Sequence, residues 1–175
     1  MTTNTTGEDR SAVISSCGSY RYRLDRRAIF GGTRFAFFGV NPSTADASID
    51  DATVRKWRGF VSRNGGGGFV VGNVFAYRAT DVRALASAAD PVGPDNAMHI
   101  QQIMQAADVL VPCWGGIAKL PAPLRWRCGV LLDELMASGK PVLTFGLTAC
   151  GNPKHPLMLG YGTPLIPYIE GRTAA

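Results

Sequence analysis

The stretch RFAFFGV at residues 34–40, followed by NPS at 41–43, decides the fold of this chain. The first part is apolar apart from its arginine, rich in phenylalanine, and bounded by glycine and proline. A short apolar run of this kind predicts a strand that is buried on both faces of a sheet. Gly39 permits a close approach of the backbone and Pro42 fixes a turn, so we expect the strand to end in a tight polar loop.

Helices and strands alternate after this strand. Residues 51–63 carry apolar side chains three and four positions apart, which is typical of an amphipathic helix. The remaining apolar runs and periodic segments predict an edge strand or hairpin arm at 20–24, strands at 69–75, 108–112 and 141–145, and helical segments at 81–88, 94–106 and 124–138. Strands that alternate with helices imply a parallel sheet with both faces covered. The expected fold class is α/β: a three-layer α/β/α sandwich around a central, mainly parallel four-stranded sheet.

Length and composition indicate one globular unit. A chain of 175 residues that is 46% hydrophobic and 18% charged can bury a substantial core and is too apolar to be disordered. We expect residues 1–18 to form a frayed tail and residues 19–171 a single domain, with a monomer favoured. No apolar run approaches the roughly 20 residues that span a bilayer, and the start lacks the pattern of a secretory signal. No membrane partner and a cytoplasmic location are therefore expected.

Several kinds of chemistry lose support because their motifs are absent. Glycines 65–68 are not followed by the Gly-Lys-Ser/Thr of a phosphate-binding loop, and GxGxxG, HExxH and GxSxG patterns are missing. The cysteines form no CxxC pair, so free thiols are expected rather than an iron–sulfur cluster or disulfides; they are Cys17, Cys113, Cys128 and Cys150. We expect no metal and no organic cofactor.

The basic balance of the chain permits an anionic partner. The net charge is +5 and the isoelectric point is near 9.3, values that suit DNA, RNA or a nucleotide. Many soluble domains are equally basic without binding nucleic acid, so charge alone leaves the partner open.

Polar loops follow the predicted strands, at the edge of the sheet where ligands bind in α/β folds. Asn41 offers an amide that orients a water or reads a ligand edge, although an asparagine there also suits a helix cap. Asn73 lies in a strand that should be buried, where it either ties down backbone or bonds a ligand. His155 lies in a tight loop, suited to donating to a developing anion or to a structural role.

In chain order, these motifs resemble those of the uracil-DNA glycosylase superfamily. Gly39-Val40-Asn41-Pro42 resembles its first motif, in which the Asn-bearing branch positions the hydrolytic water. Asn73 matches the amide that reads the base edge, and Trp114-Gly115 resembles its Trp-Gly motif. His155-Pro156 resembles the segment whose histidine stabilises the leaving base anion.

More closely, the span from about 22 to 168 resembles the bacterial and phage family called domain of unknown function 1643. The resemblance is carried by 41–46, 50–53, 73–78, Trp114-Gly115 and 151–157. That family name implies no activity, so the expected function comes from the glycosylase likeness. This likeness implies hydrolysis of an N-glycosidic bond in DNA or a nucleotide, with Asn41 and His155 as catalytic residues.

The resemblance also implies sets of binding residues. The base or substrate would contact Gly39, Pro42, Ser43, Asn73, Phe75, Tyr77, Trp114 and Gly115, with Phe75 or Tyr77 as an aromatic floor. Nucleic-acid contacts would come from Arg55, Lys56, Arg58, Arg78 and Lys154. If DNA is the substrate, its base must be flipped into the pocket.

The sequence departs from the glycosylase pattern in ways that leave other functions open. Leu157 replaces a serine, Asn41 replaces an aspartate, and acidic residues crowd the first motif at Asp46, Asp50 and Asp51. The sequence leaves two roles open for this acidic group, neutralisation by arginines and binding of a metal ion. The rival functions are a non-catalytic nucleotide or nucleic-acid binder and a base-modification enzyme with Ser43, Thr44 or Cys113 as nucleophile.

Overall fold

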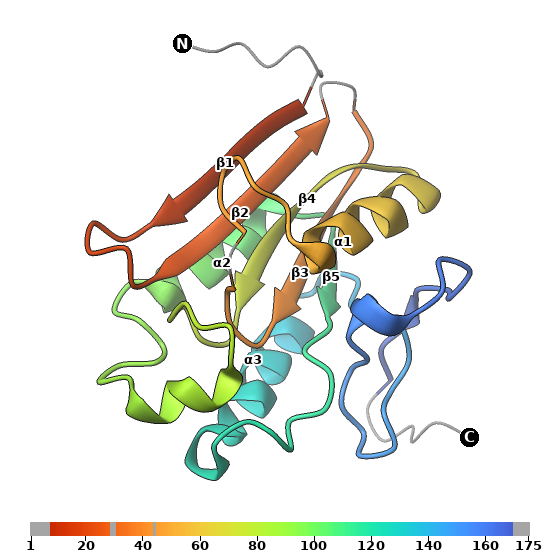
Figure 1. The fold of residues 1–175 in the computed structure, drawn as a ribbon. Coiled ribbons are helices and arrows are strands. Elements are labelled where there is room, and N and C mark those ends of the chain that lie inside the picture. The colour runs from red at the N-terminus through yellow and green to blue at the C-terminus, as the bar shows by residue number, and fades with distance from the viewer. Residues whose placement is uncertain (1–7, 29–30, 44, 170–175) are drawn as a thin grey trace.

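The computed structural model describes residues 8–28, 31–43 and 45–169, which form an α/β fold (Figure 1). The strands of the main sheet are β1 (Glu8–Ile14), β2 (Arg21–Ala28), β3 (Thr33–Gly39), β4 (Gly66–Asn73) and β5 (Val109–Pro112). The helices are α1 (Ala52–Arg63), α2 (Asn96–Ala106) and α3 (Trp126–Ala137). Short 3-10 helices lie at η1 (Val82–Ser87), η2 (Ala122–Leu124) and η3 (Pro156–Met158), and β6 (Leu143–Thr144) pairs with β7 (Ile166–Pro167).

The main sheet is mixed and five-stranded, with the order β1-β2-β4-β3-β5. β3 lies between β4 and β5 and is parallel to both, while β2 is antiparallel to β4 and β1 is antiparallel to β2. The four-stranded, mainly parallel sheet expected from the sequence is thus not what forms. Part of the segment expected to be a tail forms β1, whose pairing with β2 adds an antiparallel hairpin to the parallel centre.

The expected strand at 141–145 does not extend the main sheet. Its contact with β5 is an isolated bridge between Leu110 and Val142, and the carbonyl oxygen of Val142 accepts instead from Tyr168 N at 2.8 Å. Gly146 follows with a positive φ of 94°, which turns the chain away from the sheet. Residues 143–144 therefore pair with β7 in a separate small sheet.

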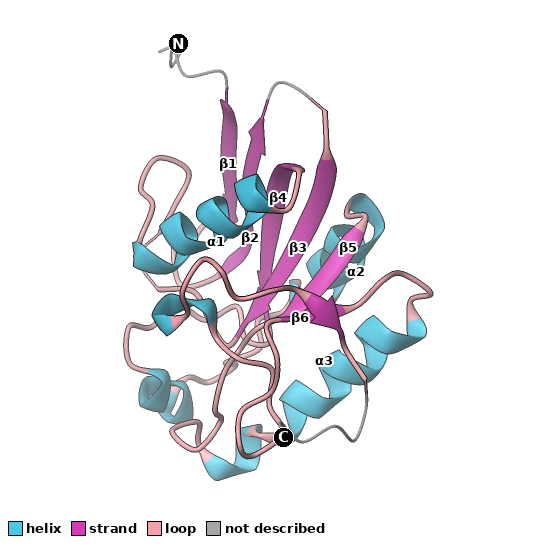
Figure 2. Cartoon of the chain, turned by 90° about the vertical axis from the view of Figure 1, so that its right-hand side faces the viewer, coloured by secondary structure: helices cyan, strands magenta, loops and turns pink. Residues whose placement is uncertain are grey.

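Helices cover the two faces of the sheet (Figure 2). Phe35 and Phe37 of β3 pack in a core with α1, while Ala36 and Phe38 pack in a second core with α2 and α3. This alternation follows from the two-residue period of a strand, which explains why the whole segment is apolar. No helix in the described part of the chain is long and apolar enough to cross a membrane.

The connections place the end of β3 at the centre of the ligand-binding edge. One crossover leads from β3 through α1 to β4 on one side, and the next leads from β4 through α2 to β5 on the other side. Gly39 and Asn73, the last residues of β3 and β4, are register partners, so the loops that follow both strands begin at the same edge. In α/β sheets a crevice opens where neighbouring connections diverge in this way.

Candidate functional site

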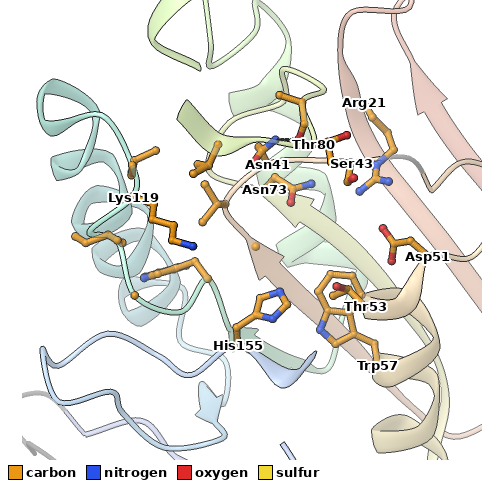
Figure 3. A pocket seen from close by; sticks show the side chains of 18 residues that line it. Arg21, Asn41, Ser43, Asp51, Thr53, Trp57, Asn73, Thr80, Lys119 and His155 are labelled. Carbon is orange, nitrogen blue, oxygen red and sulfur yellow. Dashed lines mark hydrogen bonds between the residues drawn. The ribbon is translucent and has the colours of Figure 1, made fainter. Parts of the chain in front are cut away.

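A pocket of about 290 Å³ lies at the carboxyl end of β3 (Figure 3). Of the residues expected to form the site, it is lined by Gly39, Asn41, Ser43, Asn73, Trp114 and His155, which come from four separate segments. Figure 3 shows Asn41 and Ser43 on one side of the pocket and His155 and Trp57 on the other. The sheet topology thus brings together the polar loops that follow β3, β4 and β5.

Asn41 is held by its own amide hydrogens. Its Nδ2 donates to the carbonyl oxygen of Ala79 at 2.7 Å and to that of Pro42 at 3.1 Å, and Ala79 N donates to Pro42 O at 3.0 Å. These bonds join the loops after β3 and β4 and fix the orientation of the amide, because a flipped side chain would place oxygen against oxygen. Asn41 therefore offers a ligand its Oδ1, a hydrogen-bond acceptor.

Asn73 offers the opposite polarity. Its side chain is buried, and its Nδ2 has no hydrogen-bond partner among the described residues. The backbone around it is held by Asn96, whose side chain donates to the carbonyl oxygens of Asn73 and Val74. A Cβ at Gly39 would lie 3.1 Å from Asn73 Oδ1, so glycine there makes room for the amide. The Asn73 side chain thus brings an unused donor to the pocket.

His155 is held as a neutral imidazole. Its Nδ1 accepts from Leu157 N at 3.3 Å, which leaves the hydrogen of the neutral ring on Nε2. Burial lowers the pKa of His155 below its usual value, and the charge of Asp51 opposes this shift only in part. At neutral pH, His155 can therefore donate one hydrogen bond from Nε2 without carrying charge.

Gly115 supports His155 from behind. It has a positive φ of 75°, its N–H donates to Pro153 O at 2.8 Å, and a Cβ there would lie 3.0 Å from the Cβ of His155. Glycine therefore satisfies both the backbone conformation and the close packing. Pro42 is buried beside the site, where its carbonyl oxygen accepts the Asn41 and Ala79 bonds.

The aromatic surface of the pocket differs from the expected one. Phe75 is fully buried in the core, and Tyr77 packs edge-on against Tyr20 with ring centroids 5.9 Å apart. Neither lines the pocket, which is instead lined by the indoles of Trp57 and Trp114. The sequence places Trp57 on the apolar face of the helix expected at 51–63. Its spacing from the other apolar residues of that helix gives no separate signal of a site.

Arg21 also lines the pocket, and sequence reasoning missed it. Its side chain lies at the start of β2 and is only 3% exposed. The available signal was weak: an arginine between two tyrosines on an expected edge strand has the pattern of an exposed basic residue. The carbonyl oxygen of Ala45, 24 residues further along the chain, accepts a hydrogen bond from Arg21 Nη1 at 2.6 Å, so distant packing accounts for its burial.

The residues expected to contact nucleic acid all make contacts within the protein. Arg58 pairs with Asp50 at 2.6 Å, and Arg55 donates to the Asp50 carbonyl oxygen at 2.6 Å. Lys56 lies 4.2 Å from the ring centroid of Tyr161. Two more contacts involve backbone: the Arg78 side chain donates to Gly18 O at 3.2 Å, and the backbone N–H of Lys154 donates to Gly146 O at 2.9 Å. These contacts support the loops around the pocket.

The acidic residues near the first motif have separate structural roles. Asp50 accepts ion pairs from Arg10, Arg26 and Arg58. Asp46 accepts the backbone N–H groups of the turn that follows it, and Asp51 caps α1 by accepting from Val54 N at 2.9 Å. No group of three or more candidate metal-ligating side chains occurs in the residues that the structure describes. Arginine, backbone amides and a helix cap thus account for the acidic cluster.

The candidate nucleophiles differ in access. Cys113 is fully buried, and burial raises the pKa of its thiol to about 12, so it carries no thiolate at neutral pH. Ser43 lines the pocket, and Thr44 lies outside the described residues. Of the two that the structure describes, Ser43 is the one that lines the pocket.

Comparison with known proteins gives a family and no activity. The family model described as "Protein of unknown function (DUF1643)" matches residues 21–157, which include every residue that lines the pocket. No curated protein matches the sequence.

Proposed function

We propose that this chain, which belongs to the DUF1643 family, hydrolyses the N-glycosidic bond of a nucleobase held in the pocket. The proposed reaction is that of the uracil-DNA glycosylase-like superfamily, whose motifs the chain resembles at Asn41, Asn73 and His155. The observation that carries the proposal is the polarity of these side chains. One pocket contains an oriented acceptor at Asn41 and donors at Asn73 and His155.

The reaction needs such a set of groups. The bond between the sugar C1′ and the base nitrogen breaks, and its electron pair leaves with the base as an anion. The sugar becomes oxocarbenium-like and takes up the oxygen of a water, whose released proton passes to the base or to solvent. Catalysis therefore requires a placed water and donors that stabilise the anion as it forms.

Asn41 places the water. Because both of its amide hydrogens are donated to carbonyl oxygens, its free Oδ1 accepts a hydrogen from the water and aims the oxygen lone pair at C1′. A neutral amide is too weak a base to remove the proton at this stage. Asn41 is therefore a water-orienting group, and the dissociation of the base precedes the loss of the proton.

His155 and Asn73 act on the base. The neutral His155 donates from Nε2 to the base oxygen on which negative charge develops. Asn73 donates from Nδ2 to an acceptor on the base edge and replaces the missing partner of this buried amide. The Trp57 and Trp114 indoles give the base an apolar surface on which to pack.

The test is base release from a substrate panel. Strands that carry uracil, mismatched, oxidised or hypermodified bases, and free nucleotides, are incubated with wild type, Asn41→Ala and His155→Ala. Release of a free base is measured by chromatography. We expect wild-type release and a loss of about 10²–10³-fold in each variant. His99→Ala is the matched control, because His99 stacks on Tyr22 and does not line the pocket.

Other outcomes assign other functions. Binding without release on any substrate would replace the proposal with the non-catalytic binder. Transfer of a group to the base, abolished by Ser43→Ala, would replace it with the modification enzyme.

A further inference from the structure

Arg21 is a buried cation with no ion-pair partner among the residues that the structure describes. Its side chain is 3% exposed, yet its one recorded hydrogen bond is to the backbone oxygen of Ala45, and its Nε has no partner among the described residues. No carboxylate of the described residues lies within ion-pair distance of it. A buried charge without a counter-charge is costly, and proteins normally pair it. Arg26, five residues further along β2, shows the usual solution by pairing with Asp50.

The charge of Asp51 acts on Arg21 without forming an ion pair with it. Burial lowers the pKa of the guanidinium to about 10, and Asp51 opposes that shift by its charge alone. Asp51 uses Oδ1 to cap α1. Arg21 thus stays protonated at neutral pH and lies in the pocket wall, where Figure 3 shows it beside Ser43 and above Asp51.

Further donors of the same pocket are also unused. The indole Nε1 of Trp114 is buried and lacks a partner among the described residues, as does Asn73 Nδ2. Lys119 adds a second positive charge on the exposed rim. Asp51 is the one carboxylate among the described residues that line this pocket, so Arg21 and Lys119 leave it with a net positive charge, which suits an anionic ligand with acceptor oxygens.

We infer that Arg21 binds a terminal phosphate and that the ligand is a free nucleotide. This rests on the proposed function, which supplies the base and sugar. A nucleotide flipped out of a strand leaves its phosphates esterified in the backbone outside the base pocket. A guanidinium that is 3% exposed in the pocket wall suits instead a phosphate monoester that enters with its nucleotide. Four basic side chains expected to contact a strand already contact protein groups; they are Arg55, Lys56, Arg58 and Arg78.

The test compares nucleoside 5′- and 3′-monophosphates with the same nucleosides by calorimetry. Wild type should bind a monophosphate at least about 30-fold more tightly than its nucleoside, a ratio that suits a buried charge-assisted pair. Arg21→Met should remove that preference and leave nucleoside affinity within about threefold. Arg27→Met is the matched control, since Arg27 lies on the same strand with its side chain exposed, and it should keep the preference.

A second measurement, on wild type, tests the inference even if Arg21→Met does not fold. The wild-type preference should weaken as pH falls from about 7.5 to about 5, because the second ionisation of a phosphate monoester has a pKa of about 6. Arg21→Lys should keep a reduced preference, since it retains charge but not the fork geometry. Equal affinity for nucleotide and nucleoside, no binding of either, or an unchanged preference in Arg21→Met would overturn the inference.

The two proposals fail separately. If monophosphates bind through Arg21 but no base is released from any substrate, the anion site stands and the hydrolase proposal falls. If bases are released from strands while monophosphates neither bind nor react, the hydrolase proposal stands and the free-nucleotide inference falls.

Discussion

The side chain of Asn41 donates to the carbonyl oxygen of Ala79 at 2.7 Å, across 38 residues of sequence. This bond joins the loop after β3 to the loop after β4 and turns Oδ1 of the amide into an acceptor of fixed orientation. The stability of the pocket and the chemistry that we propose for it therefore depend on the same bond.

Asn41→Asp should destabilise the protein, although the two side chains have the same shape. A carboxylate cannot donate to the carbonyl oxygens of Ala79 and Pro42 and would repel both. We expect a loss of about 1–3 kcal/mol in the free energy of unfolding, measured by denaturant titration. The control is Asn64→Asp at the end of α1, where Asn64 makes a similar bond to Phe60 O but is exposed to water, so its cost should be well below half as large. Equal costs would contradict the role given to the Asn41 amide.

Gly115→Ala should impair the site more than the backbone conformation alone explains. Its positive φ of 75° costs about 1–2 kcal/mol for alanine, and the new Cβ would lie 3.0 Å from the Cβ of His155. Gly139→Ala is the matched control, because Gly139 has a φ of 74° and open space around its Cβ position. Both variants should lose stability in thermal unfolding, but only Gly115→Ala should shift the His155 ring resonances. Unshifted resonances would show that Gly115 does not position His155.

His155 should titrate below the ordinary value of about 6.5. Burial lowers its pKa in the folded state, so the neutral ring predominates at pH 6.5 and the proton is gained mainly at lower pH. Because the unfolded chain binds that proton more readily, the contribution of His155 to stability is complete above the unfolded pKa and falls as the pH drops below it. NMR titration measures this, with His99→Gln used to assign the two histidines. A midpoint above 6.5 would contradict the neutral donor.

Asp50 should make folding sensitive to acid. Burial alone would raise its pKa, but hydrogen bonds and charges from Arg58 and Arg26 outweigh burial and lower it below the usual value. Its stabilisation is therefore present above the unfolded pKa of about 3.9 and is lost as the pH falls through the lower folded value. Asp50→Asn should cost about 3 kcal/mol at pH 7, because Arg26 is fully buried, and should flatten the acid loss. Denaturant titrations from pH 7 to pH 2 test this; parallel curves would contradict it.

Cys17 should be the most reactive thiol. It is exposed, and hydrogen bonds, chiefly with Ser15 at 3.3 Å, lower its pKa to about 7. Cys113 and Cys128 are buried with raised pKa values and should react only on unfolding. Alkylation at pH 7, followed by peptide mass spectrometry, should label Cys17 first, and Ser15→Ala should slow it. Equal labelling of Cys17 in wild type and Ser15→Ala would contradict this cause.

The sequence predicted the parallel centre of the sheet and a strand or hairpin arm at the start of β2, but it missed β1, the other arm of that hairpin. The strands β3, β4 and β5 are apolar runs because both of their faces are covered, and this pattern is visible locally. β1 and β2 carry many charges, and Arg26 is buried only because Asp50 reaches it across 24 residues. Local periodicity contains no information on such long-range pairing.

The same distinction applies to the pocket. Asn41, Asn73, Trp114 and His155 were identified because polar loops after parallel strands share one edge of a sheet. Arg21 and Trp57 were not identified, because their roles arise only when distant segments pack together. Packing buries the arginine without an ion pair and leaves one side of the core tryptophan facing the pocket. The unused donors, on which the anion site is based, therefore became visible only in three dimensions.

The most direct test of the central claim is base release in water enriched with ¹⁸O, with the products analysed by mass spectrometry. Hydrolysis at C1′ predicts an unlabelled free base and a sugar product that gains one ¹⁸O, with release lowered about 10²–10³-fold in Asn41→Ala. Label in the base, or a release rate that is the same in Asn41→Ala and wild type, would contradict the water-orienting role and the reaction proposed for this pocket.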